Sequence, residues 1–266
     1  MQTSKPKGFY AKPVIRERRY DPMPVKEEEV KKILEYVHDG KHVSPKLSPG
    51  TRRFLAQRDC ALIAMLWLFG KRISEILKLR IKDVWEENGE LRVKFTIEKK
   101  AKTYKLCECK ALNSKTASYC KQCGRSLESA PLKTTKAGEV TVVKRKSLLV
   151  DPVFYITFWR GEWLKRVRDV SAFLFPTLVV RHTSSGIKVA VNPWRHISRQ
   201  RAHQLLAMFG LSPHLFRSAF AKRLLRKTKN VRLVQSAGDW SSISSLLEYA
   251  RSLGETPEDE QFSKLE

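Results

Sequence analysis

The chain has 266 residues, of which 52 are Lys or Arg and 27 are Asp or Glu, so its formal net charge is +25 at pH 7. A hydrophobic fraction of 42% excludes an intrinsically disordered chain and indicates at least one sizeable buried core. The excess of positive charge favours a polyanionic partner, and we expect nucleic acid. A ribosomal or merely basic soluble protein is the less specific alternative.

No segment of the sequence predicts a membrane span or a secretion signal. The longest apolar run, Cys60 to Gly70, is far shorter than the ~20 residues that a spanning helix needs. The basic N-terminus lacks the apolar core of a signal peptide. We therefore expect an intracellular protein, in the cytoplasm or nucleoid, with no membrane partner.

The first third of the chain predicts helices followed by a strand. Residues 1–24 are basic and punctuated by proline, and are interpreted as an N-terminal arm. Apolar residues at helical spacing predict a helix that begins near Val25, a buried helix over 52–70 and a further helix over 73–84. Alternating apolar and polar residues predict a strand over 91–97.

The rest of the chain is expected to return to helix after a hairpin. A cysteine-rich insert, residues 106–128, interrupts this hairpin, and its returning strand is expected at 139–150. A helix with an aromatic face is predicted over 151–167, and residues 173–188 are expected to form a loop. Further helices are expected over 193–210, 212–228, 231–240 and 241–254, before a polar tail at 255–266. The predicted fold class is mainly α with a small antiparallel β-sheet.

Four of the five cysteines lie close together, as Cys107, Cys109, Cys120 and Cys123. Inside a cell such a cluster indicates a metal site rather than disulfides, although four ordinary cysteines are the alternative. Two pairs of thiolates provide a closed tetrahedral site, so we expect a structural Zn²⁺ ion. The segment resembles a short zinc ribbon, but the single residue between Cys107 and Cys109 makes that turn tighter than usual.

Basic residues surround these cysteines, which makes the insert a candidate for an additional DNA contact. They are Lys105, Lys110, Lys115, Lys121 and Arg125. The metal would replace the apolar core that an insert of this size is too small to build.

Three separated stretches carry the candidate chemistry: GKRISE at 70–75, HLFR at 214–217, and GDW at 238–240 followed by Tyr249. The first stretch lies where a buried helix is expected to end, so Arg72 would project from a rigid junction. Glu75, one helical turn further on, could orient the Arg72 side chain. The His and Arg of the second share one helical face, so both can address one phosphate. Each also has a purely structural reading, as a helix cap, a helix N-terminal residue or a packed ring.

These motifs, in this order, resemble the tyrosine recombinase family of phage integrases and Xer proteins, over about 25–253. The family's motifs are G-x-R-x-S-E, H-x-x-R and a G-[HW]-x-S stretch that leads to a nucleophilic Tyr. The resemblance implies a catalytic domain over 25–254 with the zinc ribbon inserted in a β-hairpin. It also implies DNA cleavage through a 3′-phosphotyrosyl bond, without a catalytic metal or ATP.

The same resemblance assigns a role to each residue. Arg72 and Arg217 would bind the non-bridging oxygens of the scissile phosphate, where negative charge develops. His214 would assist proton transfer and Tyr249 would attack phosphorus. Trp240 stands where many members have a second His; its indole N–H donates a hydrogen bond but cannot shuttle protons, which favours a positioning role.

The family also uses a lysine on a β-hairpin to protonate the leaving 5′ oxygen. Lys100 and Lys102 are the best candidates here, with Lys99 behind them. Lys133 and Lys136, on the far side of the insert, are alternatives. Each of these lysines is equally well explained as a phosphate-contacting or solvated residue.

The resemblance implies a site-specific recombinase that acts on double-stranded DNA as at least a transient tetramer. It would exchange strands through a Holliday junction and integrate or excise a mobile element, and the zinc ribbon favours an archaeal or viral source. The alternatives are a type IB topoisomerase-like or telomere-resolvase-like enzyme, and a catalytically silent zinc-ribbon DNA-binding protein. Since family members usually carry an N-terminal DNA-clamping domain, we expect either an excised catalytic domain or a minimal integrase.

Overall fold

The computed structural model describes residues 25–97, 103–134, 138–145, 152–183 and 186–238, together with Trp240, Leu246 and Tyr249. The chain divides into two compact units, of which residues 94–142 form the smaller and the flanking segments the larger. The predicted N-terminal arm, the polar tail and most of the helix expected over 241–254 lie outside the described residues. Among the helices that are described, none combines the length and the apolar content that crossing a bilayer requires.

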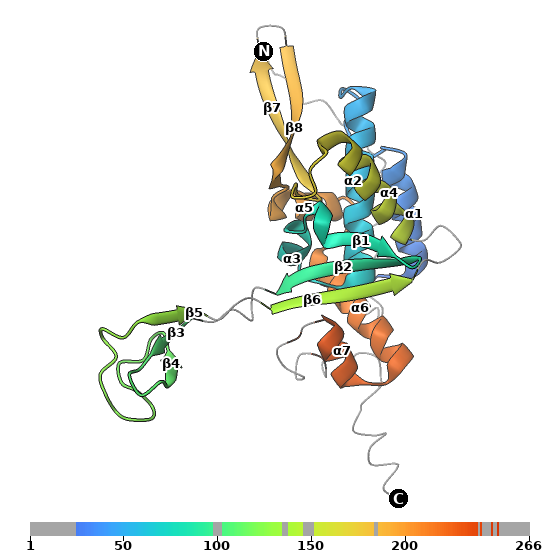
Figure 1. The fold of residues 1–266 in the computed structure, drawn as a ribbon. Coiled ribbons are helices and arrows are strands. Elements are labelled where there is room, and N and C mark those ends of the chain that lie inside the picture. Colours follow the sequence, from blue (N-terminus) through green and yellow to red (C-terminus); the bar gives the residue numbers. More distant parts are fainter. Residues whose placement is uncertain are drawn as a thin grey trace, which may run out of the picture. The chain divides into compact units, whose positions relative to one another are not determined.

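The larger unit is built around one long buried helix, α2. The helices of this unit are α1 (Glu27–His38), α2 (Pro49–Phe69), α3 (Ile73–Leu77), α4 (Pro152–Val167), α5 (Arg199–Ala207), α6 (Pro213–Thr228) and α7 (Val231–Gly238). α2 contacts α1, α4 and α6 (Figure 1). Because apolar residues surround its whole circumference, α2 is stable only when other helices cover it.

Aromatic side chains fill the contact between α2 and α4. The rings of Trp159 and Trp163 stack with centroids 6.0 Å apart, and Phe54 of α2 meets Trp159 edge to face at 5.0 Å. The two indole N–H groups donate to the carbonyls of Leu174 and Phe173, at 2.8 and 2.9 Å. The aromatic face predicted for this helix therefore packs the core and also fixes the chain that follows α4.

α2 also carries a buried charged network that the sequence did not reveal. Asp59 accepts hydrogen bonds from Nε and Nη2 of Arg58 at 2.8 and 2.7 Å, and Nε2 of His42 lies 3.1 Å from its other oxygen. Nη1 of Arg58 donates to the carbonyl of Pro176 at 3.1 Å. Burial opposes ionisation of Asp59, but the charge of Arg58 and the hydrogen bond with His42 outweigh it and lower the pKa of this carboxyl.

A small sheet follows α3, in the strand order β1-β2-β6. Its strands are β1 (Val84–Glu87), β2 (Glu90–Ile97) and β6 (Gly138–Arg145), and β2 and β6 confirm the two strands predicted for the hairpin. The helix predicted over 73–84 is wrong beyond Leu77. After α3 the chain is extended and reaches a 3₁₀ turn at Ile81–Asp83, and the N–H of Ile81 donates to the carbonyl of Ala172 at 3.0 Å. Leu79, before this turn, and Ile81, its first residue, are both buried, so apolar burial continues after the helix has ended.

A second, two-stranded sheet corrects the loop expected over 173–188. β7 (Pro176–Thr183) and β8 (Gly186–His196) form an antiparallel hairpin. The helix expected from residue 193 begins only at Arg199, where Ser198 caps α5 by accepting from the N–H of Arg201 at 3.1 Å. Residues 193–196 belong instead to the end of β8.

The smaller unit contains the predicted insert, residues 106–128. Three short antiparallel strands form its sheet, in the order β4-β3-β5: β3 (Thr103–Leu106), β4 (Leu112–Ser114) and β5 (Leu132–Thr134). Its buried cluster consists of Cys107, Ala111, Cys120 and Leu127. A core of this size buries little apolar surface, and half of its members are cysteines.

Candidate active site and candidate metal centre

Arg217 occupies the centre of the candidate active site, on the buried side of α6. Its Nη1 donates to the carbonyl of Gly70 at 2.8 Å, and its Nη2 donates to the carbonyl of Gly238 at 2.7 Å. The residue is only 8% exposed. Gly70 ends α2 and Gly238 ends α7, so one guanidinium joins all three of the stretches expected to carry chemistry. We call this arrangement the Arg217 clamp.

Gly70 is required at its position for two reasons. Its φ of 56° lies in the left-handed region, where it ends α2 by donating its N–H to the carbonyl of Leu66 at 3.2 Å. A Cβ on this residue would also lie 2.3 Å from the ring of Phe220 on α6. The glycine therefore lets α6 approach the end of α2 closely enough for the Arg217 clamp to form.

Trp240 covers the clamp. The guanidinium carbon of Arg217 lies 4.1 Å from the centroid of the indole, which is a cation–π contact. The indole also lies directly against Gly238, because a Cβ there would come within 1.4 Å of a ring atom. The ring of Tyr249 meets Trp240 edge to face, with centroids 6.4 Å apart. Arg217, Trp240 and Tyr249, which lie on three separate segments, thus form one contiguous group.

Arg72 lies at the start of α3, two residues after the first glycine of the clamp. The buried carboxylate of Glu75 accepts a hydrogen bond from the backbone N–H of Arg72 at 3.0 Å and another from its Nη1 at 2.9 Å. The arginine side chain keeps 21% of its surface exposed, whereas that of Glu75 keeps 2%. The carboxylate one turn on therefore orients Arg72, as the sequence predicted, and leaves part of the guanidinium at the surface.

The other predicted residues are less closely assembled. His214 lies in the first turn of α6, one turn before Arg217, but it is exposed where Arg217 is buried. The candidate general acids Lys100 and Lys102, as well as Lys99 and Lys136, fall outside the described residues. Lys133 is exposed on β5, in the smaller unit.

Sequence reasoning missed what holds Arg217. The two glycines were recognised as motif positions, but their carbonyls, which orient the guanidinium, are invisible in side-chain patterns. The available signal was the occurrence of glycine at the head of two separate motifs, since glycine permits close approach of backbone to another group.

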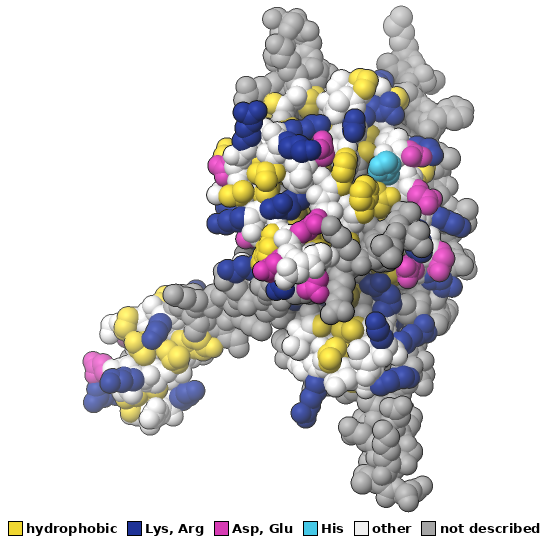
Figure 2. Space-filling model, turned by 45° about the vertical axis from the view of Figure 1, so that its right-hand side comes forward, with side chains coloured by type: hydrophobic (Ala, Val, Ile, Leu, Met, Phe, Trp, Pro, Cys, Tyr) yellow, Lys and Arg dark blue, Asp and Glu magenta, His cyan; other side chains and the backbone are white. Residues whose placement is uncertain are grey.

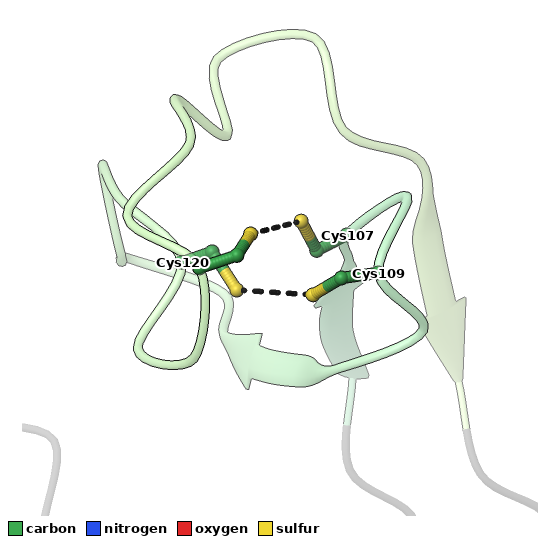
Figure 3. A group of neighbouring side chains, drawn as sticks. Cys107, Cys109 and Cys120 are labelled. Carbon is green, nitrogen blue, oxygen red and sulfur yellow. Dashed lines mark hydrogen bonds between the residues drawn. The ribbon is translucent and has the colours of Figure 1, made fainter.

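In the smaller unit, the four predicted thiols converge. The sulfur atoms of Cys107, Cys109, Cys120 and Cys123 all lie within 4.8 Å of one another. Cys107 is 3.5 Å from Cys123, and Cys109 is 3.6 Å from Cys120 (Figure 3). Zinc at about 2.3 Å from each sulfur of a tetrahedron separates the sulfurs by about 3.8 Å, whereas a disulfide requires about 2.05 Å. The donor set and its spacing fit a tetrahedral metal ion rather than disulfides.

Asn113 links the two cysteine turns. This buried side chain donates from Nδ2 to the carbonyl of Ala111 at 3.1 Å and to the sulfur of Cys120 at 3.5 Å, and its Oδ1 accepts from the N–H of Lys121 at 2.9 Å. The backbone N–H groups of Cys123 and Gln122 outweigh burial and lower the pKa of the Cys120 thiol to about 6. The thiolate form that metal binding requires is thus favoured at Cys120. At Cys109 the backbone N–H of Ala111 lowers the pKa, but the hydrogen bond with Cys123 and burial outweigh it and raise the pKa to about 12.

The basic residues predicted around this site are mostly at the surface. Lys110, Lys115 and Lys121 are exposed, while Lys105 donates to the carbonyl of Ala117 at 3.0 Å and the exposed Arg125 pairs with Glu108. Tyr119 is 70% exposed. Lys and Arg side chains are also widely spread over the face of the molecule that Figure 2 shows. DNA contact by the ribbon stays a prediction.

Comparison with known proteins identifies a family. The sequence profile of the phage integrase family matches residues 24–255. A search of curated protein sequences finds no significant match.

Several solved structures of recombinases match this chain, each with a TM-score below 0.5. The XerH site-specific recombinase bound to palindromic difH substrate is 19% identical with a TM-score of 0.48, over 85% of this chain and 49% of that one. The XerA recombinase is 15% identical with a TM-score of 0.45, over 85% and 59% of the two chains. The Tn1549 transposon integrase in complex with circular intermediate DNA is 13% identical with a TM-score of 0.43, over 86% and 61%. The chain thus spans about half to three-fifths of the length of these proteins.

Proposed function

The chain belongs to the phage integrase family, and from this premise we propose that it is a site-specific DNA recombinase that cleaves and rejoins strands through a covalent bond to Tyr249. One observation carries the proposal: Arg217, clamped by two backbone carbonyls, touches Trp240, which in turn touches Tyr249. A fixed guanidinium and a phenol held in one group of side chains are what metal-independent phosphoryl transfer to tyrosine requires.

In the proposed reaction the hydroxyl oxygen of Tyr249 attacks the phosphorus of a backbone phosphodiester. The bond from phosphorus to the 5′ oxygen breaks, the phenol proton passes to a base, with His214 as the candidate, and the 5′ oxygen takes up a proton from a general acid. Lys100 and Lys102 are the candidates for that acid. Attack by a 5′ hydroxyl reverses these steps, and because the phosphotyrosyl bond conserves the energy of the original bond, no ATP is needed.

The two arginines are assigned to the transition state. It carries additional negative charge on the non-bridging oxygens, which planar guanidinium groups neutralise with paired hydrogen bonds. The clamp fixes the plane of Arg217 before DNA binds, and Glu75 does the same for Arg72. Such preorganisation makes electrostatic stabilisation effective, because the groups need not reorient during the reaction. Trp240 is assigned the positioning of Arg217 rather than proton transfer.

The remaining parts of the proposal concern assembly and partners. Residues Cys107, Cys109, Cys120 and Cys123 would hold a structural Zn²⁺ ion, which cross-links the ribbon and supplies no step of the reaction. Four protomers on two double-stranded DNA sites would exchange strands through a Holliday junction, to integrate or excise a mobile element. We place the protein inside the cell, on the DNA of its host or of a virus.

A nicked duplex that loses a short strand after cleavage tests the proposal, because it traps the covalent intermediate. We expect a DNA–protein adduct that survives denaturation, in buffer without added divalent cations. Tyr249→Phe should abolish the adduct, and Arg217→Lys should slow its formation by about 10²–10³-fold. Tyr36→Phe, which removes a phenol from α1, is the matched control and should leave the adduct unchanged. An adduct that persists in Tyr249→Phe contradicts the assignment of the nucleophile.

A further inference from the structure

A long stretch of the larger unit contains basic residues and no acidic ones. Residues 170–238 include eight arginines and four lysines but no Asp or Glu, and they make up β7, β8, α5, α6 and α7. In the part of the chain that the structure describes, neither Arg195 nor Arg201 forms an ion pair with a carboxylate. Arg217 and Lys222 of this stretch are buried, whereas Arg195 and Arg201 are exposed. Exposed cations with no carboxylate partner attract polyanions.

A β-bulge at the base of the β7–β8 hairpin presents two side chains to solvent. Pro176 pairs with His196 but the next residue of β7 pairs with Asn192, so Pro193, Trp194 and Arg195 have no partner on β7. The carbonyl of Pro193 accepts a hydrogen bond from the backbone N–H of Phe173 at 2.9 Å. The backbone N–H of Trp194 donates to Oδ1 of Asn192 at 3.0 Å. Trp194 is 56% exposed and Arg195 is also exposed. Bulges commonly re-aim side chains in this way next to functional sites.

The bulge borders a pocket of about 570 Å³. Thr177–Val179 of β7 line it, together with the basic side chains of Arg195, His196 and Arg201 and the hydroxyl-bearing Ser198. Nδ1 of His196 lies 2.7 Å from the carbonyl of Ile197, which fixes the orientation of the ring. A pocket of this size accommodates a nucleotide-sized group. None of its lining residues belongs to the three cleavage motifs.

We propose that this hairpin-base pocket binds a phosphate of the DNA backbone, with Arg195 and Arg201 as its ligands. Trp194, beside the pocket, contacts the adjoining sugar or base. Duplex DNA as the source of the phosphate rests on the proposed function, whereas the pocket, its charge and the bulge are independent of it. The contact adds affinity away from the scissile phosphate and positions the protein on its site without reading sequence.

Salt dependence of DNA binding tests this proposal. Arg195→Gln combined with Arg201→Gln is compared with its parent by fluorescence anisotropy on a short duplex, with Tyr249→Phe in every variant so that no cleavage intervenes. Each lost phosphate contact lowers the slope of log affinity against log salt by about 0.9, so we expect loss of this single contact to give a slope smaller by about one and binding weaker by about tenfold at moderate salt. Lys31→Gln with Lys32→Gln removes the same charge from the exposed side of α1 and should leave the slope unchanged.

A second measurement locates the contact. Single phosphates of the duplex are replaced by uncharged methylphosphonates, and we expect one replacement to weaken binding of the parent but to have no effect on the Arg195→Gln, Arg201→Gln variant. Thermal unfolding of that variant should match the parent, since both arginines are exposed. Equal salt-dependence slopes for the Arg195→Gln, Arg201→Gln variant and the α1 control would overturn the proposal. The proposal would also be wrong if every methylphosphonate weakened binding of this variant as much as it weakens binding of the parent. Failure of the wild-type chain to form a covalent adduct would overturn the proposed function alone.

Discussion

The two units of this protein achieve a defined structure by different means. The larger unit has a core of large apolar side chains, such as Phe54, Phe69 and Trp159, packed around α2. The ribbon has a buried cluster of four small residues, two of which are cysteines. The described segment 103–134, which contains the ribbon, is too short to bury enough apolar surface to offset the conformational entropy of folding. We therefore expect the fold of this segment to depend on a metal ion at the four thiols, and that of the larger unit not to.

Both units nevertheless use one polar centre to join distant segments. In the ribbon, four sulfurs from two turns converge on one point. In the larger unit, the ends of α2 and α7 converge on Arg217. The difference is that the Arg217 clamp sits on a core that is already folded, so it determines local geometry rather than the existence of the fold.

Metal removal should have the largest effect on stability, and it should unfold the ribbon while the larger unit stays folded. Chelation, or Cys120→Ser, should remove hydrogen-exchange protection from residues 103–134 while α2 keeps its own, because structural zinc contributes roughly 10–16 kcal/mol to the folding of such sites. Metal content is measured in parallel. Cys60→Ala, which changes the cysteine buried in α2, should retain the metal. If residues 103–134 keep their hydrogen-exchange protection after chelation, the ribbon does not depend on metal and the two units do not differ in this respect.

Asp59→Asn tests whether the larger unit tolerates loss of its buried charge. Arg58 would lose its partner in the core, so we expect unfolding in urea at pH 7 to become easier by about 3–5 kcal/mol. The pKa of Asp59 is lowered by folding, so its contribution is present above the unfolded value of about 3.9 and is lost as pH falls through the folded value. Parent and variant should therefore converge in acid. Asp39→Asn, at an exposed carboxylate, is the control and should show a much smaller difference at pH 7.

Gly70→Ala should disturb the Arg217 clamp at a smaller cost. The new Cβ needs a left-handed conformation and would meet the Phe220 ring, so we expect a loss of about 2–4 kcal/mol in the free energy of unfolding, together with slower adduct formation. Gly161→Ala in α4 meets no atom within 4 Å and should instead stabilise the unit by about 0.5–1 kcal/mol. Denaturant unfolding of both variants should show a lower free energy of unfolding for Gly70→Ala and a higher one for Gly161→Ala.

Arg125→Gln should have the smallest effect. It breaks the pair with Glu108 on the ribbon surface, where both side chains are mostly exposed. Exposed ion pairs contribute about 0–1 kcal/mol, so metal affinity measured by competition with a chelator should be almost unchanged. A large loss of affinity would mean that surface charge, rather than the thiolates, holds the ribbon together.

Elements of the fold were predictable where the sequence pattern fits only one type of secondary structure. α2 was predictable because an apolar run of that length between turn residues fits only a buried helix. The β7–β8 hairpin was not, because the short apolar runs 178–180 and 189–191 are too brief to show a period. Leu79 misled for a related reason, since it follows Ile76 at helical spacing although it is buried beyond the end of α3.

The candidate site was predictable in its residue types but not in its supports. The motifs and their resemblance to a family named Arg72, Arg217 and Tyr249, and the cysteine spacing named four thiols that the structure brings together. Their role as metal ligands stays a prediction. The Arg217 clamp was not predictable, because every residue has a backbone carbonyl and the sequence does not show which of them accepts a hydrogen bond. Gly70 also lies 147 positions from Arg217. The hairpin-base pocket depends on a bulge, which no side-chain pattern specified.

The Arg217 clamp also has a consequence for biosynthesis. Gly70 leaves the ribosome long before Arg217, but Gly238 follows it, so a nascent chain that ends before residue 238 has only one of the two carbonyls that orient the guanidinium. An incompletely translated polypeptide can thus contain all of α2 and still lack a complete Arg217 clamp. On the proposed function, the guanidinium that would bind the scissile phosphate is oriented by both carbonyls only after residue 238 has been translated.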